Sequence, residues 1–191
     1  PFFGRTKSEL ENVKKSDALN HPNWSMGSKI TIDSATMMNK GLEFIEAVWL
    51  FDIKPENIDI VVHRESVVHS LVEFIDNSVI AQLGVPDMCI PIQYAFTYPD
   101  RYESPAVELS LTDYGKLTFF KPDYETFECI DICREAIKRG GLYPAIVNGA
   151  NEKAVELFLR DKIKFTDIGI IVRAAMDNVS VPENYTLEDI F

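Results

Sequence analysis

The clearest pattern along the chain is an apolar stripe with helical spacing in its first third. Apolar residues recur there every three or four positions, which predicts a helix from about Thr36 to Phe51. The stripe consists of Met38, Leu42, Ile45 and Trp49. The opposite, polar side of this helix carries Asn39, Lys40, Glu43 and Glu46.

The segments before this helix are predicted to be mostly irregular. One short helix is expected at Ser8–Lys15, within a surface segment of charged and small polar residues. His21–Gly27 is predicted to be a loop because its sequence, HPNWSMG, contains Pro, Asn, Ser and Gly. A short strand is expected at Lys29–Ile32, where two isoleucines alternate, and it should end at Asp33-Ser34.

Residues with β-branched side chains dominate the next part of the chain. Strands are predicted at 58–62, 67–75 and 79–83, the last two joined as a hairpin through Asp76-Asn77-Ser78. Residues 86–122 contain five prolines and show weak periodicity, so they are expected to form an extended connection.

Helical spacing returns after this connection. The first predicted helix carries an apolar stripe and ends at Gly140-Gly141, where glycine suits a left-handed cap. Two more helices are predicted at Ala145–Leu159 and at Asp167–Met176, the latter capped by Thr166. The stripe of the first helix consists of Phe127, Ile130, Cys133 and Ile137.

These elements predict an α+β fold, with a mixed or antiparallel sheet flanked by helices and followed by a small C-terminal helical bundle. The expected division is a catalytic domain at 1–97, a linker at 98–122 and a helical domain at 123–191. Both ends are expected to be truncated, because the chain lacks an initiator Met and stops where a helix led by Thr186 begins.

Composition narrows the functional classes. The 30 acidic and 19 basic residues give a net charge of -11, which disfavours binding to nucleic acid or to an anionic membrane. No apolar run is long enough for a membrane span and no signal peptide is recognisable, so a cytosolic location is expected. The three cysteines, Cys89, Cys129 and Cys133, are predicted to be apolar core thiols.

The start of the predicted helix at 36–51 carries the strongest chemical signal. Backbone N–H groups at a helix start favour an anion, and hydroxyl, amide and ammonium donors complete a phosphate cradle. The candidate donors are Ser34, Thr36, Asn39 and Lys40. The spacing alone is equally compatible with Ser34 and Thr36 acting only as helix caps and Lys40 as a solvated charge.

Glu43 follows Asn39 by four residues and Lys40 by three, so these side chains should leave the same helix face and reach one ligand. A hard divalent cation needs several oxygen ligands, so Glu43 supplies only part of a magnesium or manganese site. The alternative is an ordinary charged helix face formed by Glu43 and Glu46.

The histidines and the HPNWSMG loop suggest a second functional element. His21, His63 and His69 lack the spacing of a zinc site. His69 lies in an apolar strand, where a core histidine is the usual explanation, whereas His21 heads the loop. This loop carries Trp24, so we interpret it as a lid that closes over a ligand.

The motif Asn148-Gly-Ala-Asn-Glu152 falls inside a predicted helix. We interpret it as structural, with Gly149 and Ala150 packing closely and the Asn and Glu side chains bonding to neighbouring elements.

Ordered sequence blocks resemble the 1-deoxy-D-xylulose-5-phosphate reductoisomerase family. The blocks are HPNWSMG at 21–27, DSATMMNKGLEFIEA at 33–47, HRESVVHSLVEF at 63–74, AQLGVPDM at 81–88 and FTDI at 165–168. Members of this family isomerise 1-deoxy-D-xylulose 5-phosphate by retro-aldol and aldol steps. They then reduce the aldehyde with NADPH to 2-C-methyl-D-erythritol 4-phosphate, for isoprenoid biosynthesis.

The resemblance implies roles for the polar residues of the helix start. Ser34, Asn39 and Lys40 would bind the substrate phosphate, and Glu43 would bind a divalent metal (Mg, Mn or Co) that chelates the substrate oxygens. The family also implies a homodimer and binding of phosphonohydroxamate inhibitors.

The resemblance implies further roles outside this helix. His21 would contact the substrate from the lid, Trp24 would cover the substrate, Met26 and Met88 would lie next to the nicotinamide, and His69 would lie near the reacting carbons. The expected catalytic residues are therefore His21, Glu43 and His69. The family's N-terminal NADPH-binding domain has no counterpart in this chain, so the chain is expected to be inactive alone.

Two rival functions are compatible with the residues. One is a non-catalytic module that binds phosphorylated ligands or dimerises, and the other is a metal-dependent sugar-phosphate aldolase or isomerase without nicotinamide. The resemblance favours the reductoisomerase over both.

Overall fold

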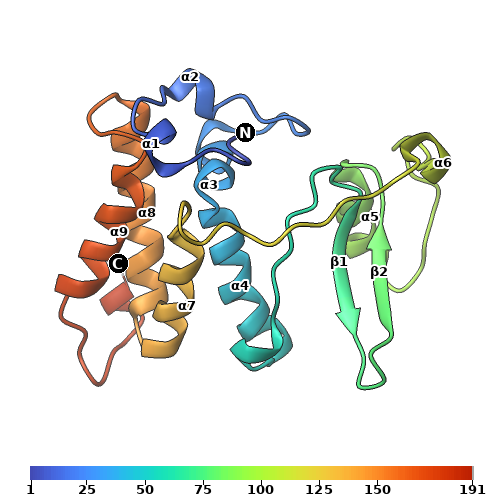
Figure 1. Ribbon diagram of the computed structural model, residues 1–191. Helices are drawn as coiled ribbons and strands as arrows, with labels where there is room; N and C mark the ends of the chain where they lie inside the picture. Colours follow the sequence, from blue (N-terminus) through green and yellow to red (C-terminus); the bar gives the residue numbers. More distant parts are fainter. Residues whose placement is uncertain (191) are drawn as a thin grey trace. The chain divides into compact units, whose positions relative to one another are not determined.

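The computed structural model describes residues 1–190 and divides the chain into two compact units. Unit 1 comprises Pro1–Ile60 and the chain from Asp123 onward, and unit 2 comprises Val61–Pro122. Helices form unit 1, and a hairpin with short helices forms unit 2 (Figure 1). The predicted α+β class is therefore confirmed.

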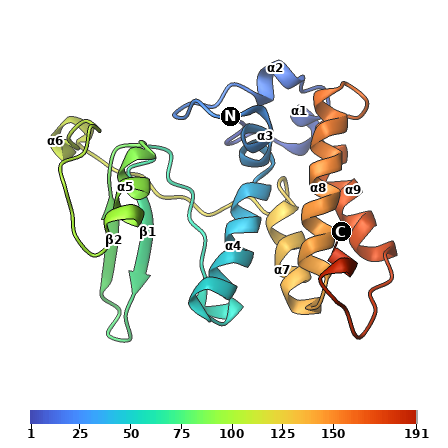
Figure 2. The same ribbon diagram turned by 180° about the vertical axis from the view of Figure 1, so that it is seen from behind.

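Unit 1 is a helical assembly in which segments far apart in sequence lie side by side (Figures 1 and 2). Helix α7 contacts α4, α8 and α9, and α3 contacts both α4 and α8. The helices are α1 (Lys7–Leu10), α2 (Lys15–Ala18), α3 (Ser28–Thr36), α4 (Met38–Phe51), η1 (Pro55–Asn57), α7 (Cys129–Arg139), α8 (Tyr143–Leu159), α9 (Asp167–Asn178) and η2 (Glu188–Ile190).

The core of unit 1 combines residues from both ends of the chain. One cluster joins Ile32 and Ala35 of α3 to Ala154 and Phe158 of α8. A second joins Met38 of α4 to α7, α8 and α9. Because apolar burial is the main favourable term in folding, these shared clusters hold the early and late helices together.

The compact units do not follow the sequential division at 1–97, 98–122 and 123–191. Helices 28–51 share one core with the later helices, whereas residues 61–122 form a unit of their own. Sequence order misses this because the core depends on pairings across more than a hundred residues. Assignment of 1–97 to a catalytic domain stays a prediction, since packing does not define activity.

The predicted strand at 29–32 is wrong, because this segment belongs to helix α3. Its buried residues are Thr31, Ile32, Asp33, Ala35 and Thr36, which is helical rather than alternating spacing. Ile30 is exposed, so the two isoleucines do not share a face. The Thr31 hydroxyl donates to the Gly27 carbonyl at 2.8 Å, a bond typical of threonine in a helix.

Helix α4 begins at Met38 rather than at Thr36 and ends at Phe51 as predicted. Met38 is fully buried, and Leu42 and Ile45 pack against the second cluster. The buried stripe does not extend to Trp49, which is 73% exposed. Phe44, which the predicted stripe did not include, is buried. The last residues of α4, Trp49–Phe51, are therefore exposed.

The helices after residue 123 agree closely with the predicted ones, and α7 ends at Gly140 with φ 72°. The predicted Thr166 cap is wrong, because Thr166 has helical backbone angles and no side-chain cap bond. Instead, the Asp167 carboxylate accepts from the Lys164 amide at 2.8 Å.

The predicted helix at 8–15 is replaced by the single-turn helices α1 and α2.

Two of the three cysteines are core thiols, as predicted. Cys129 and Cys133 are buried in α7, and burial raises the pKa of both thiols, that of Cys133 to about 12. Cys89 is exposed, so the prediction is wrong for this residue.

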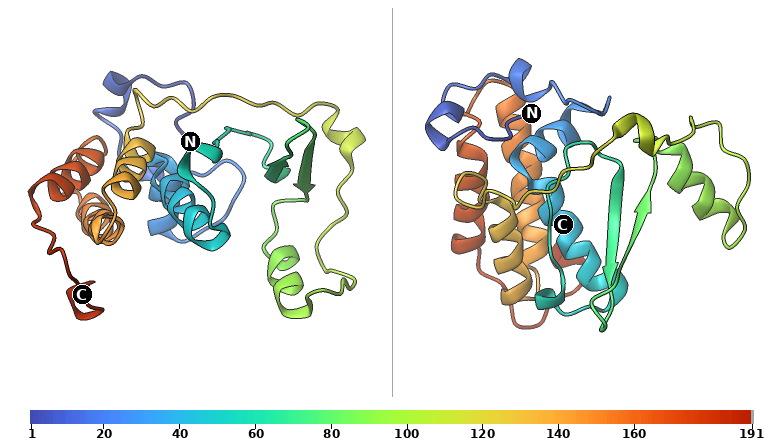
Figure 3. Two further views of the ribbon diagram at one scale, coloured as in Figure 1. Left: turned by 90° about the horizontal axis from the view of Figure 1, so that it is seen from below. Right: turned by 45° about the vertical axis from the view of Figure 1, so that its right-hand side comes forward.

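Unit 2 contains the predicted hairpin. Strands β1 (Val68–Glu73) and β2 (Val79–Leu83) pair antiparallel, with Val72 opposite Ile80 and a bulge after Val68. The strand predicted at 58–62 is reduced to one bridge between Val62 and Phe120. The predicted extended connection contains helices α5 (Cys89–Thr97) and α6 (Leu111–Tyr114), which Figure 3 shows in two further views.

Both faces of the hairpin carry exposed apolar side chains. They are Leu71, Val72, Phe74, Ile75, Val79, Ile80 and Leu83. Exposed apolar side chains gathered on one hairpin are compatible with an interaction surface. Homodimer formation stays a prediction.

Within residues 1–190, every helix is too short or too polar to cross a membrane.

Gly41 permits the close approach of α4 to α7. A Cβ at this position would lie 2.6 Å from Cys133 Sγ and 3.1 Å from the Cys129 carbonyl oxygen. Gly149 in α8 has open space at the same place. The close packing predicted for Gly149 is therefore wrong and belongs to Gly41 instead.

We predict opposite effects for Gly41→Ala and Gly149→Ala. Overpacking at the α4–α7 contact should lower the free energy of unfolding by about 1–2 kcal/mol for Gly41→Ala. Better helix propensity should raise it by about 0.5–1 kcal/mol for Gly149→Ala. Urea denaturation followed by circular dichroism measures both. A stabilised Gly41→Ala protein would contradict this account of the α4–α7 contact.

Candidate functional site

The junction between α3 and α4 positions the candidate phosphate site. Helix α3 ends at Thr36, Met37 adopts a left-handed conformation with φ 62°, and α4 starts at Met38. A left-handed non-glycine residue is strained and persists only where its surroundings fix it. The junction therefore sets the direction in which the positive end of α4 presents its first-turn amides.

Three polar side chains from the first two turns of α4 form one bonded cluster. Asn39 Nδ2 donates to Glu43 Oε1 at 2.8 Å, and Lys40 Nζ forms an ion pair with Glu43 Oε2. The prediction that these three residues share a helix face is confirmed, and we call Asn39, Lys40 and Glu43 the α4 cluster. Their roles toward phosphate and metal stay predictions.

Glu43 occupies the donors that a phosphate group would need. Its carboxylate takes one Asn39 amide hydrogen bond and the Lys40 ammonium. Both charged side chains are more than 40% exposed, and such an exposed ion pair is worth about 0–1 kcal/mol. Breaking the contacts of Glu43 with Lys40 would therefore cost little.

Ser34 lies one turn before the junction and is half-buried. Its hydroxyl donates to the Ile30 carbonyl at 2.9 Å instead of joining the α4 cluster. A contact with phosphate requires rotation of this hydroxyl away from its own helix.

Glu43 is also the predicted metal ligand. Its exposed carboxylate offers hard oxygen atoms, the donor type that magnesium and manganese prefer. Across residues 1–190, no three His, Cys, Asp or Glu side chains gather closely enough to hold a metal ion. The role of Glu43 as one ligand of a divalent metal stays a prediction.

The predicted loop at 21–27 has no regular secondary structure. His21 Nδ1 accepts the amide hydrogens of Asn23 at 3.2 Å and Trp24 at 3.0 Å, so the neutral ring carries its proton on Nε2. Partial burial, with the chain's N-terminal charge as a second cause, lowers the pKa of His21. Trp24 and Met26 are both half-buried. The lid function stays a prediction.

His69 and Met88 lie in unit 2, whereas the α4 cluster lies in unit 1. His69 is exposed on β1, with Nε2 3.0 Å from the Ser66 carbonyl oxygen, so it is not a core histidine. Met88 directly precedes α5 and is 54% exposed. Their predicted roles near the reacting carbons and the nicotinamide stay predictions.

The buried histidine of unit 2 is His63 instead. Its ring stacks on Phe119 with centroids 4.7 Å apart, and Nδ1 lies 2.9 Å from the Thr118 carbonyl oxygen. Glu65 also reaches Nδ1, at 3.1 Å. These contacts give His63 a structural role at the base of the hairpin.

Sequence reasoning missed a polar network beside the junction. Asn151 Nδ2 in α8 donates to Asp33 Oδ1 in α3 at 2.9 Å, and both residues are buried. Lys29 bridges Asp33 and Glu152 at 2.7 Å each. Partial burial disfavours the Lys29 charge, but its bonds to the two carboxylates raise its pKa. The predicted bonding of the NGANE motif to a neighbouring element is thus confirmed.

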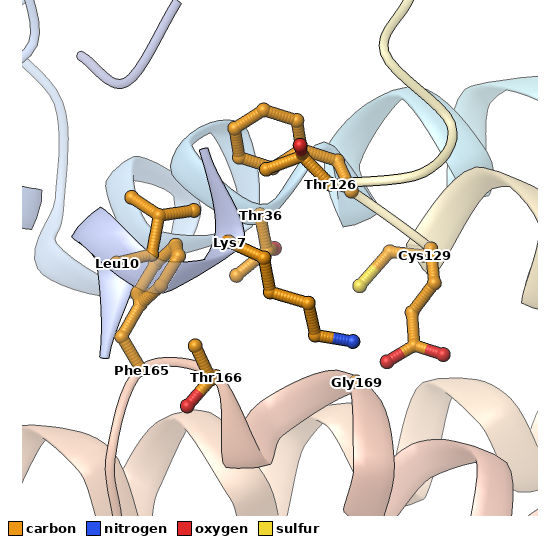
Figure 4. A pocket seen from close by; sticks show the side chains of 10 residues that line it. Lys7, Leu10, Thr36, Thr126, Cys129, Phe165, Thr166 and Gly169 are labelled. Carbon is orange, nitrogen blue, oxygen red and sulfur yellow. The ribbon is translucent and has the colours of Figure 1, made fainter. Parts of the chain in front are cut away.

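A small pocket lies between α1, α3, α7 and α9, with Thr36 and Lys7 on its walls (Figure 4). Its volume is about 30 Å³, which suits about one water molecule and no sugar phosphate. The α4 cluster, Asn39–Glu43, is not part of its lining.

Two family profiles match the chain. The family described as "DXP reductoisomerase C-terminal domain" matches residues 83–191. The family described as "1-deoxy-D-xylulose 5-phosphate reductoisomerase C-terminal domain" matches residues 1–51, which include the α4 cluster.

Among curated relatives, the reductoisomerase of Acetivibrio thermocellus is 56% identical over 190 residues, covering 100% of this chain and 50% of the relative. The reductoisomerase of Bacillus subtilis is 55% identical over 190 residues, covering 99% of this chain and 50% of the relative. The chain spans about half the length of the curated relatives it matches.

Solved structures agree with the fold. The reductoisomerase of Zymomonas mobilis in complex with NADPH has a TM-score of 0.92 and 45% identity, covering 100% of this chain and 49% of that one. A reductoisomerase in complex with NADPH, fosmidomycin and magnesium has a TM-score of 0.90 and 50% identity. The match covers 93% of this chain and 43% of that chain. Sequence, profile and fold thus agree, and the chain belongs to the 1-deoxy-D-xylulose 5-phosphate reductoisomerase family.

Proposed function

We propose that this chain forms the substrate-binding part of a reductoisomerase that converts 1-deoxy-D-xylulose 5-phosphate to 2-C-methyl-D-erythritol 4-phosphate. The observation that carries the proposal is the bonded cluster of Asn39, Lys40 and Glu43 at the start of α4, inside a segment that matches the family. Relatives of this family bind fosmidomycin, magnesium and NADPH.

The start of α4 is the proposed phosphate subsite. Asn39 and Lys40 supply an amide donor and a positive charge, and the first-turn amides add donors at the positive end of the helix dipole. Ser34 adds its hydroxyl after rotation. Holding the phosphate at this end lets binding energy remote from the reacting carbons orient them.

Phosphate binding releases Glu43. When the phosphate takes Asn39 and Lys40, the Glu43 carboxylate loses both partners and is available as a metal ligand. A divalent metal bound there supplies Lewis-acid polarisation of the substrate oxygens. The two subsites are therefore expected to fill together.

His21 and Trp24 belong to the proposed lid. Because His21 Nδ1 accepts two backbone amides, its Nε2–H is the group that can donate to a substrate oxygen. Closure of the Trp24 ring over the substrate excludes water from the reacting carbons. Met26 and Met88 are the residues proposed to contact the nicotinamide of NADPH.

Lys40→Ala should weaken binding of the phosphonohydroxamate fosmidomycin in isothermal titration calorimetry with magnesium present. The substitution removes the only ammonium of the α4 cluster, so we expect a loss of affinity of roughly tenfold to hundredfold. Lys138→Ala, an exposed lysine of α7, serves as the matched control and should bind like wild type. Equal affinities for all three proteins would refute the phosphate subsite.

Glu43→Gln should tighten binding of inorganic phosphate in the absence of metal. The substitution weakens the competitor that occupies Lys40, and the exposed pair is worth about 0–1 kcal/mol, so a gain of up to about fivefold is expected. Phosphate titration in EDTA measures it. Glu46→Gln, on the same helix, controls for the change in net charge. Weaker phosphate binding by Glu43→Gln alone would mean that Glu43 does not compete for this site.

A further inference from the structure

A buried hydrogen bond links α8 to the end of α3. Asn151 is fully buried and donates through Nδ2 to Asp33 Oδ1 at 2.9 Å. Asp33 is 3% exposed, and Lys29 neutralises its charge at 2.7 Å. Asp33 directly precedes Ser34, so this hydrogen bond anchors α3 immediately before a residue of the proposed phosphate subsite.

The same bond continues into α4 through the backbone. The Thr36 hydroxyl donates to the Asp33 carbonyl at 3.2 Å and accepts the Met38 amide at 3.3 Å. A continuous path thus runs from Asn151 through Asp33 and Thr36 to the first amide of α4. We name it the α8–α3–α4 hydrogen-bond path.

We propose that Asp33 and Asn151 are positioning residues for the phosphate-binding start of α4. The inference rests on the proposed function. Asn39 and Lys40 follow the strained Met37 junction within three residues, so their direction depends on how firmly that junction is held. The α8–α3–α4 hydrogen-bond path holds the Met37 junction from both sides, through Thr36 before it and Met38 after it.

The polarity of this link argues for positioning over bulk stability. Asn151 Oδ1 is buried and finds no hydrogen-bond donor among residues 1–190, which is costly in a core. Two apolar side chains of similar size would avoid that cost. A directional bond fixes the angle of the junction, which apolar contacts do not.

The test replaces Asn151 by Ala and measures fosmidomycin affinity by calorimetry with magnesium, far below the melting temperature. Loss of the bond should weaken affinity roughly tenfold, because small displacements of ligand-binding groups are costly. Amide hydrogen exchange at Met38 and Asn39 should accelerate more than exchange in α9. Asn148→Ala, an exposed asparagine of the same motif, should change neither quantity.

Two further variants separate positioning from folding. Thr36→Val keeps the Asn151–Asp33 bond but removes the hydroxyl link, and it should weaken affinity and speed Met38 exchange similarly. The double variant Asp33→Asn with Asn151→Asp swaps the two side chains, so the amide lies on α3 and the carboxylate on α8. It should restore affinity toward wild type. If Asn151→Ala does not fold, these two variants decide the question.

A lower melting temperature with unchanged affinity and unchanged relative exchange at Met38 would overturn the inference. If wild type and all variants fail to bind fosmidomycin, the proposed function loses its support. Amide exchange then decides the positioning role alone: equal exchange in wild type and Asn151→Ala overturns it, and selective acceleration at Met38 supports it.

Discussion

The position of α3 in unit 1 depends on its contacts with α8. The Asn151–Asp33 hydrogen bond and the Lys29 bridge supply direction, and the cluster around Ile32, Ala35 and Phe158 supplies apolar burial. Helix α4 then leaves α3 at an angle fixed by Met37 and packs on α7 through Gly41. The segment that carries the candidate site is thus held at both ends by the late helices.

This arrangement bears on the proposed binding role of the exposed α4 cluster. Asn39, Lys40 and Glu43 lie on a helix whose other face packs into the second core cluster, and this packing fixes the spacing of their backbone positions. Glu43 serves as an internal counter-anion that balances Lys40. Breaking this ion pair costs little, because both side chains are partly exposed, so the pair is no obstacle to the proposed phosphate and metal sites.

Local sequence patterns predicted the parts of the structure that depend on neighbouring residues. The hairpin, the late helices and the shared face of Asn39, Lys40 and Glu43 follow from periodicity and turn chemistry. Helix α3 was missed because two alternating isoleucines resemble a strand, while its helical burial depends on contacts with α8. The Asp33–Asn151 pair spans 118 positions, and no local spacing predicts such a pairing.

The most direct test of the central claim is a ¹⁵N–¹H correlation spectrum of the chain titrated with inorganic phosphate. A phosphate subsite at the start of α4 predicts saturable shifts that are largest at the backbone amides of Asn39 and Lys40 and at the Asn39 side-chain amide. Shifts scattered over exposed lysines, or concentrated at the start of another helix such as α9, would contradict the claim.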